Sequence, residues 1–312
     1  MRLIRGLYNI PSDFSGCVAT IGNFDGVHLG HQAILQQLKK QGEEHQLPTV
    51  VMMFEPQPRE FFAPDQAPAR LANMSEKLQD LARFGIDYVL CLPFNQKLRS
   101  MSADQFIQTI LLDGLKISHL IVGDDFRFGC DRTGDYQLLQ KTGQQAGEST
   151  REKSGFSVED TQTFELDGER VSSTRIREYL SDNDLAAASK LLGRPYRMSG
   201  RIGYGRQLGR TIGVPTANVI LQRNKLPMTG VYAVKAIEIK VDACHESSAS
   251  DQDGKIIEWQ GVANIGVKPT VAGTPEPSLE VHIFDFPGNG EDENLYGKRL
   301  SIEFCQKIRE EK

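Results

Sequence analysis

The sequence lacks the features that mark several large classes of protein. Its 5 cysteines are scattered and form no CxxC pair, which argues against a disulfide framework and against a cysteine zinc site. No apolar run approaches the roughly 18–20 residues of a membrane span, and the N-terminal "MRLIRGLYNIP" has no signal-peptide core. Basic residues number 36 against 41 acidic ones and form no run, which argues against a nucleic-acid partner. We therefore expect a cytoplasmic enzyme that binds neither nucleic acid nor membranes.

The first part of the chain, up to about Arg194, alternates strand and helix signals. At 312 residues the chain is longer than one core usually needs, so we expect two domains. The alternation predicts an α/β domain with an open parallel sheet. Apolar, β-branched runs predict strands at residues 17–22, 49–54, 86–92 and 119–123. Periodic stretches predict helices at 29–41, at 75–85 between a Ser75 cap and Gly85, and at 102–114 with a Ser102–Gln105 capping box.

After Pro195 the pattern changes to short apolar runs separated by Gly, Pro and Asp, without an amphipathic helix. This pattern predicts an antiparallel barrel or sandwich. The predicted strands are residues 230–241, 258–267, 278–286 and 299–304, and the polar stretches 144–155 and 243–255 are predicted surface loops.

Three marked loops follow the predicted parallel strands. "GNFDGVHLGH" follows the first strand, "EPQPREFF" the second and "GDDFRFG" the fourth. Because the carboxyl ends of parallel strands share one edge of a sheet, we expect these loops to meet in a ligand-binding cleft. For "EPQP" an ordinary turn remains an alternative.

Two of the chain's 6 histidines, His28 and His31, stand at the start of a predicted helix. Free backbone N–H groups and the helix dipole favour an anion there, and imidazoles add hydrogen-bond donors without a fixed charge. Surface histidines or half of a metal site are the alternatives.

A second cluster, "RVSSTRIREYL", also opens a helix. It combines the hydroxyls of Ser173 and Thr174 with the guanidinium groups of Arg170, Arg175 and Arg177. Hydroxyls, a helix start and bidentate guanidinium groups have the composition of a phosphate clamp. A plain helix cap is the alternative for the two hydroxyls.

Together, "GNFDGVHLGH", "FEPQPREFF", "VGDDFRFG" and "RVSSTRIR" closely resemble the adenylyltransferase half of the bacterial bifunctional riboflavin kinase/FAD synthetase family. Residues 28–31 resemble the HxGH signature, which alone would also suit a cytidylyltransferase or a class I aminoacyl-tRNA synthetase. The resemblance implies a Rossmann-like domain in which His28, His31 and Arg177 assist attack of FMN on the α-phosphate of ATP, with Mg²⁺ sharing the charge. It implies ATP-binding residues Gly22, Asn23, Asp25, Gly30, Asp125, Ser173 and Thr174, and flavin-binding residues Pro56, Pro58 and Phe62.

"GYGRQLGRTIGVPTAN", residues 203–218, is rich in glycine but lacks the Gly-Lys-Ser/Thr ending of a P-loop. Its glycines can present N–H groups to phosphates. Thr216 and Asn218 offer neutral oxygen atoms suited to partly hydrated Mg²⁺. An ordinary barrel hairpin is the alternative.

The same segment closely resembles the riboflavin kinase signature ending in PTAN, and "GVANIG", "LEVHIFDF" and "LYG" follow in family order. The resemblance implies an antiparallel β-barrel in which Thr216 and Asn218 hold Mg²⁺-ATP and Glu280 is the general base for the riboflavin 5′-hydroxyl. The alternative for Glu280 is an outward-facing strand residue. The implied ATP-binding residues of this half are Gly205, Arg206, Gly209, Gly213 and Pro215.

We therefore expect an FMN adenylyltransferase domain at residues 1–185 and a riboflavin kinase domain at 186–312, using riboflavin, FMN and ATP. The alternatives are a chain with one active site, the synthetase, and a flavin-sensing regulator without turnover. The sequence departs from the family pattern at Lys268, where arginine is usual, and at Val214, where an aromatic residue is usual. It also stops short of the family's usual C-terminal region, so we expect a truncated kinase domain.

Overall fold

The structure is a computed structural model that divides into two compact units. The first unit comprises Met1–Ala67 and Asp80–Arg170, and the second comprises Pro68–Gln79 and Val171–Lys312. The catalytic halves predicted at 1–185 and 186–312 remain a prediction, because this division by contacts follows different boundaries. The residues described are 1–123, 125–148, 155–161, 163–203, 216–241, 246–248, 257–269, 275–284 and 295–311.

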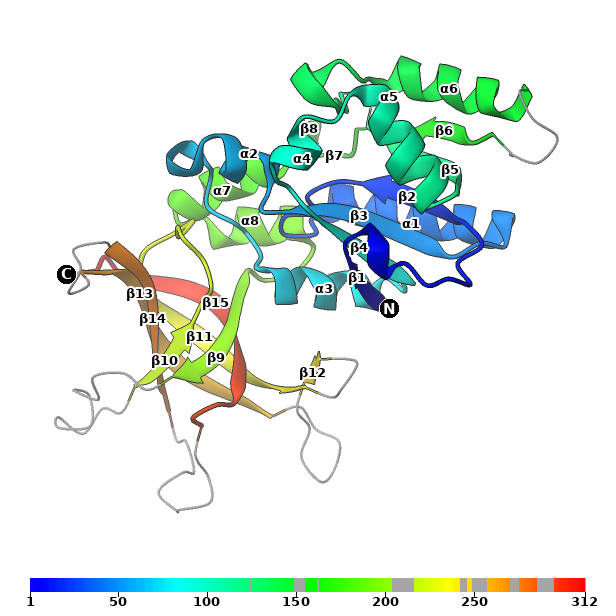
Figure 1. Cartoon of the computed structure of the whole chain (residues 1–312). Helices are drawn as coiled ribbons and strands as arrows, with labels where there is room; N and C mark the ends of the chain where they lie inside the picture. The colour runs from blue at the N-terminus through cyan, green and yellow to red at the C-terminus, as the bar shows by residue number, and fades with distance from the viewer. Residues whose placement is uncertain are drawn as a thin grey trace. The chain divides into compact units, whose positions relative to one another are not determined.

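The first unit is built on a parallel sheet with the strand order β1-β4-β3-β2-β5-β6 (Figure 1). The predicted strands are confirmed as β2, β3, β4 and β5. The two edge strands, β1 and β6, were not predicted, because their short sequences RLIR and SVED contain charged residues that face solvent. The bounds are β1 Arg2–Arg5, β2 Cys17–Ile21, β3 Thr49–Glu55, β4 Tyr88–Pro93, β5 Ile117–Val122 and β6 Ser157–Asp160.

Alternate residues of β2 face two different layers of helices. Cys17 and Ala19 belong to one apolar cluster with Ile110. Val18 faces the other way, toward Gly42, where an added Cβ would lie 3.5 Å from the Val18 side chain. Helices therefore cover both faces of the sheet. The helices encoded before residue 171 are α1 Leu29–His45, α2 Pro58–Phe62, α3 Met74–Arg83, α4 Gln96–Arg99, α5 Ala103–Phe106, η3 Ile107–Gly114 and α6 Tyr136–Glu148, with short turns η1 Leu7–Asn9, η2 Pro64–Gln66 and η4 Cys130–Arg132 and a small hairpin of β7 Glu165–Leu166 and β8 Glu169–Arg170.

The helix predicted at residues 102–114 is only partly α-helical. Its capping box is confirmed, since the Gln105 amide donates to Ser102 Oγ at 3.1 Å. Beyond residue 106 the chain forms the π-helix η3, in which the Leu115 amide reaches the Ile110 carbonyl at 2.9 Å. The wider turn still buries Ile107 and Ile110, so hydrophobic periodicity does not distinguish it from an α-helix.

Three further predictions of local structure were wrong for residues that the structure describes. Asn73, and not Ser75, caps α3: the Glu76 amide donates to Asn73 Oδ1 at 2.9 Å, and the Asn73 amide donates to Glu76 Oε2 at 2.7 Å. Residues 144–148 end helix α6 instead of forming a loop, and residues 149–154 lie outside the described residues. Of the predicted loop 243–255, the described residues 246–248 form a strand, β12.

The second unit is an antiparallel barrel, which settles the choice between barrel and sandwich. Its strand order is β12-β11-β13-β14-β10-β9-β15, and the additional pairing of β11 with β15 closes the ring (Figure 1). The unit also contains helices α7 and α8. The bounds are α7 Ser173–Ser181, α8 Leu185–Leu192, β9 Arg197–Gly203, β10 Ala217–Ile220, β11 Gly230–Val241, β12 Glu246–Ser248, β13 Glu258–Pro269, β14 Pro275–Ile283 and β15 Arg299–Arg309.

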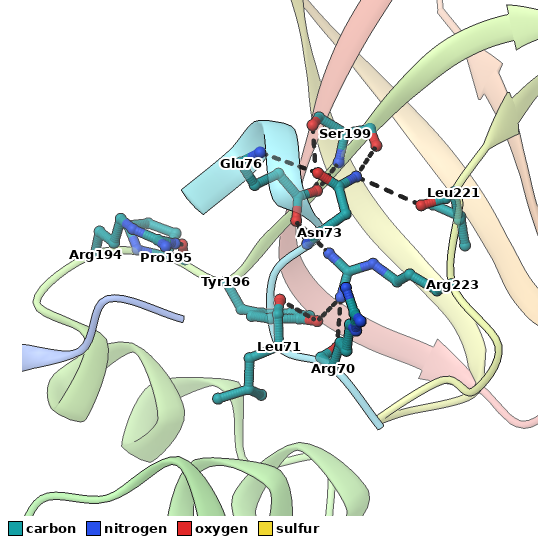
Figure 2. A network of polar contacts seen from close by, with 10 residues as sticks. All are labelled: Arg70, Leu71, Asn73, Glu76, Arg194, Pro195, Tyr196, Ser199, Leu221 and Arg223. Atoms are coloured by element: carbon teal, nitrogen blue, oxygen red, sulfur yellow. Dashed lines mark hydrogen bonds and ion pairs between the residues drawn. The ribbon is translucent and has the colours of Figure 1, made fainter. Parts of the chain in front are cut away.

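A buried ion pair ties the segment Pro68–Gln79 into the barrel unit. Arg223 Nη2 lies 2.5 Å from Glu76 Oε2, and the two side chains are 0% and 3% exposed. Figure 2 shows the guanidinium group between Glu76, the Arg70 carbonyl at 2.6 Å and the Tyr196 hydroxyl at 3.3 Å. Glu76 Oε1 also accepts a hydrogen bond from the Ser199 amide. The network therefore joins residues that are more than a hundred positions apart in the sequence.

We predict that Arg223→Met lowers the stability of the second unit by about 3–5 kcal/mol, because it leaves the Glu76 carboxylate buried without its partner. Urea unfolding can be followed at Trp259, the only tryptophan, which lies on β13 of this unit. Lys235→Met is the matched control. It breaks an ion pair of 3.2 Å whose side chains are both 43% exposed, and should barely move the midpoint. Equal midpoints for the two variants would contradict the prediction.

Candidate functional sites

The order of strands in the first sheet reverses between β2 and β5. From β2 the chain proceeds to β3 and β4 on one side, and β5 then pairs with the other side of β2. In open α/β sheets, ligands bind in the crevice outside the carboxyl ends of the strands at such a reversal. Residues 22–28 follow β2 and residues 125–128 follow β5, so both segments lie at this place, as the sequence predicted.

His28 and His31 lie together at the start of α1, as predicted. His28 is itself the N-cap, and its Nδ1 accepts a hydrogen bond from the His31 amide at 3.3 Å. The two rings stack with centroids 3.7 Å apart and planes 17° apart. The Phe24 ring packs against the His31 ring with centroids 4.9 Å apart, so an aromatic residue supports the pair.

The loop before α1 has an unusual backbone that fixes this pair. Phe24 and Val27 have φ values of 46° and 43°, in the left-handed region that side chains rarely adopt, and Gly26 lies between them at 86°. Phe24 and Val27 are each only 1% exposed, so burial of their side chains holds the loop in this conformation. The result is a rigid turn that presents two imidazoles where a helix start favours an anion.

Five other predicted nucleotide-binding residues, Gly22, Asn23, Asp25, Gly30 and Asp125, occupy the same two loops or the first turn of α1. Asp25 is buried, whereas Asn23 and Asp125 are exposed. At Gly22 an added Cβ would lie 3.0 Å from the Phe24 ring, so a larger residue would disturb the turn. Gly30 is the second residue of α1 and is half-buried. Asp125 Oδ2 lies 3.7 Å from an Arg170 nitrogen.

The predicted flavin-binding residues Pro56, Pro58 and Phe62 follow β3, and Phe62 lies in an aromatic cluster. Pro58 begins α2, which the Gln57–Glu60 capping box fixes at its start, and Phe62 at its end is 58% exposed. Phe94 also belongs to this cluster, although the sequence motifs did not single it out, and its ring lies 5.6 Å from that of Phe62. Phe94 directly follows the carboxyl end of β4, so the rule used for the other loops would have found it. The cluster comprises Phe54, Phe61, Phe62 and Phe94, with the Arg99 guanidinium 5.5 Å from the Phe62 centroid.

Helix α7 of the second unit carries the predicted phosphate-binding hydroxyls and arginine. Ser172 is the N-cap and accepts a hydrogen bond from the Arg175 amide at 3.3 Å, so the capping alternative is wrong for Ser173 and Thr174. These two residues form the first turn of the helix, where Thr174 is exposed and Ser173 half-buried. Arg177 lies one turn further and donates from Nε to the Ala69 carbonyl at 2.6 Å.

In the barrel, strand register brings together two predicted residues that are far apart in the sequence. Asn218 on β10 is directly opposite Glu280 on β14, and Glu280 is directly opposite Asn264 on β13. Directly opposed residues place their side chains on the same face of a sheet. Leu279 and Val281 on either side of Glu280 are buried in the barrel, so this polar row lies on its outer face.

Thr216 immediately precedes β10 and lies two residues before Asn218, so both belong to the same side of this chain segment. Lys268 on β13 forms an ion pair with Glu280, a contact that sequence reasoning did not identify. The predicted ATP-binding residues Gly205, Arg206, Gly209, Gly213 and Pro215 lie outside the described residues.

Comparison with known proteins assigns each half of the chain to a family. The family model described as FAD synthetase matches residues 10–175, and the model described as riboflavin kinase matches residues 192–312. Curated relatives described as bifunctional riboflavin kinase/FMN adenylyltransferase include proteins of Pseudomonas fluorescens, 51% identical, and Escherichia coli K12, 46% identical. In both cases the match covers 100% of this chain and 90% of the relative.

A similar solved structure is a crystal structure described as a macrolide-efflux protein from Streptococcus pneumoniae. It is 27% identical, has a TM-score of 0.74 and matches 99% of this chain and 92% of its own. The description of that structure names macrolide efflux, whereas both family models and the curated relatives are described as enzymes of flavin synthesis. Across the described part of this chain, no helix has the length and apolar character to cross a bilayer.

We predict that His28→Ala weakens the start of α1 by roughly 1 kcal/mol, because the N-cap acceptor for the His31 amide is lost. His28→Asn is the matched control, since asparagine supplies a side-chain oxygen at the same position. The measurement is hydrogen exchange of the first-turn amides of α1. Faster exchange is expected for His28→Ala and near-normal exchange for His28→Asn. Unchanged exchange in the alanine variant would show that the cap does not hold the helix start.

Proposed function

Because the chain belongs to the family of bifunctional riboflavin kinases/FMN adenylyltransferases, we propose that it makes FMN from riboflavin and ATP, and FAD from FMN and ATP. The barrel of the second unit supplies the kinase, and the parallel sheet of the first unit supplies the adenylyltransferase centre. Both reactions consume ATP, which favours a cytoplasmic location. Neither reaction calls for a nucleic-acid or membrane partner.

The stacked His28–His31 pair at the crevice beside β2 and β5 supports the adenylyltransferase assignment. A phosphate oxygen of FMN attacks the α-phosphorus of ATP, the bond from that phosphorus to the bridging oxygen breaks, and pyrophosphate leaves. The imidazoles and the start of α1 stabilise the charge on the α-phosphate, so no covalent intermediate is needed. Mg²⁺, when bound, neutralises part of the phosphate charge.

The remaining predicted residues take supporting roles in this proposal. Phe62 has the exposed aromatic surface that a flavin ring can stack on, and its neighbours in the aromatic cluster hold it in place. Asp125 is exposed on the loop after β5, where it can contact the nucleoside. Ser173, Thr174 and Arg177 are assigned to the phosphates, for which a helix start with hydroxyls and a guanidinium group is suited.

The cross-strand row of Asn218 and Glu280 supports the kinase assignment. Glu280 accepts the proton of the riboflavin 5′-hydroxyl, the resulting oxygen forms a bond to the γ-phosphorus of ATP, and ADP leaves with the bridging oxygen. Thr216 and Asn218 offer a hydroxyl and an amide oxygen on one side of the same segment. This neutral donor set fits an Mg²⁺ ion that also keeps water and phosphate oxygens.

One assay separates this proposal from its alternatives. The chain is incubated with riboflavin and Mg-ATP, and the flavins are resolved by chromatography. We expect FMN to form and then FAD. If supplied FMN becomes FAD but riboflavin is not phosphorylated, only the synthetase site is active. If flavin binds tightly but no product forms, the chain is a regulator.

We predict that His28→Asn and His31→Ala lower FAD formation by about 10²–10⁴-fold, the range for losing one positioned catalytic group. His28→Asn keeps the helix cap and so tests the imidazole itself. Riboflavin phosphorylation by the same protein is the internal control and should survive. Equal loss of both activities in a variant that still unfolds cooperatively would disprove the assignment to separate sites.

We also predict that Glu280→Gln abolishes most FMN production while binding of Mg-ADP, measured by equilibrium dialysis, is kept. The amide has the shape of the carboxylate but cannot accept the proton of the hydroxyl. FMN supplied directly should still become FAD at the normal rate. A kinase turnover close to that of the unchanged chain would remove Glu280 from the role of base.

A further inference from the structure

We propose that Lys268 is a positioning residue for the proposed base Glu280. The inference rests on the kinase activity proposed above and adds a residue to that site. The Lys268 ammonium group forms an ion pair with Oε1 of Glu280, and the side chains are 47% and 30% exposed. The contact joins two strands, because Lys268 lies on β13 and Glu280 on the neighbouring β14.

The register makes this contact a diagonal one. Glu280 is directly opposite Asn264, whereas Lys268 is directly opposite Glu276, four positions before Glu280 on β14. The lysine side chain must therefore extend back along the barrel surface past Gly266, which has no side chain on this face. Lys268 thus reaches past the acid directly opposite it and contacts Glu280.

The ion pair gives Glu280 the orientation that a general base needs. A glutamate on an outer strand face has several rotamers, and a proton acceptor must be held at hydrogen-bond distance, about 2.6–3.2 Å, from the reacting hydroxyl. Asn218 and Asn264 flank Glu280 on the two neighbouring strands and limit movement across the sheet. The contact with Lys268 fixes Oε1 along the strand direction, which leaves Oε2 to accept the proton of the 5′-hydroxyl.

This role can be distinguished from a contribution to stability. Both side chains are substantially exposed, and such surface ion pairs add little to the free energy of folding. A loss of turnover without a loss of stability is therefore the signature of positioning. Arginine carries the same charge as lysine and offers a fork of donors to a carboxylate, so an arginine at this position should keep the contact with Glu280.

The test compares Lys268→Met with Lys268→Arg in the riboflavin kinase reaction. We expect Lys268→Met to lower kcat by about 10–100-fold, as for small misplacements of a reacting group, with both KM values within about twofold. Lys268→Arg should keep kcat within about threefold. FAD formation from FMN, the urea midpoint of Trp259 and the dissociation constant for Mg-ADP should be unchanged in both variants.

Two further variants separate this proposal from the proposed function. In the Glu280→Gln background, Lys268→Met should cause no further loss, because residues that act as one unit are not additive. Glu311→Gln is the control, since the Glu311 carboxylate lies against Gly266 on the path of the lysine side chain, and the kcat of this variant should be normal. If Glu280→Gln keeps full activity, the proposed base and the positioning role both fail.

If Glu280→Gln is inactive but Lys268→Met keeps kcat within twofold, only the positioning role is overturned. The positioning role is also overturned if Lys268→Arg lowers kcat as much as Lys268→Met does, or if the reductions in kcat from Lys268→Met and Glu280→Gln add in the double variant. Weaker binding of Mg-ADP or a lower urea midpoint in Lys268→Met would overturn it as well. Normal KM values, a reduced kcat and rescue by arginine together support it.

Discussion

The parallel pairing of β2 with β3 on one side and β5 on the other is the constraint on which the first site depends. Every residue of β2 is buried, so this strand can only lie in the middle of the sheet, between two layers of helices. Parallel neighbours send the chain out of the sheet at the same edge, and the reversal of strand order leaves a crevice there. The stacked histidines occupy this crevice because the turn of residues 22–28 joins β2 directly to α1.

The second site depends on a different constraint, the closure of the barrel. The pairing of β11 with β15 completes the ring, and a closed ring leaves each strand one register with its apolar residues inside. Once Leu279 and Val281 face inward, Glu280 must face outward, beside Asn218 and Asn264. The first site therefore uses a helix start and a loop, whereas the second uses the face of paired strands.

Much of this architecture could be predicted from the sequence, because it is determined by patterns among neighbouring residues. Apolar runs identified β2 to β5, and the histidines were recognisable as the start of a helix. Edge strands β1 and β6 could not be found in this way, since their side chains are not buried on both faces. The "NMSE" segment contains the cap of α3, but Ser75 is equally suitable by type, and the choice of Asn73 depends on Glu76.

Other parts of the sites could not be predicted, because they depend on contacts between distant residues. The alternation around Glu280 is the same whichever face is buried, and only the pairing of β10, β14 and β13 decides it. The contact of Lys268 with Glu280 requires this register as well, so in the sequence Lys268 was only a departure from a family pattern. The roles of His28, His31, Arg177 and Glu280 remain predictions.

The buried pair of Glu76 and Arg223 has a consequence for how such chains can evolve. The acid is encoded within the segment that matches the FAD synthetase family, and the base within the segment that matches the riboflavin kinase family. A recombination event that replaced one half would separate Glu76 from Arg223. The charge left behind would be buried without its partner, which is strongly destabilising. Selection must then keep the two codons together or replace both with apolar residues. Exchange of one half alone therefore requires that the new half supply the matching buried charge, even though the chemistry of the two halves is separate.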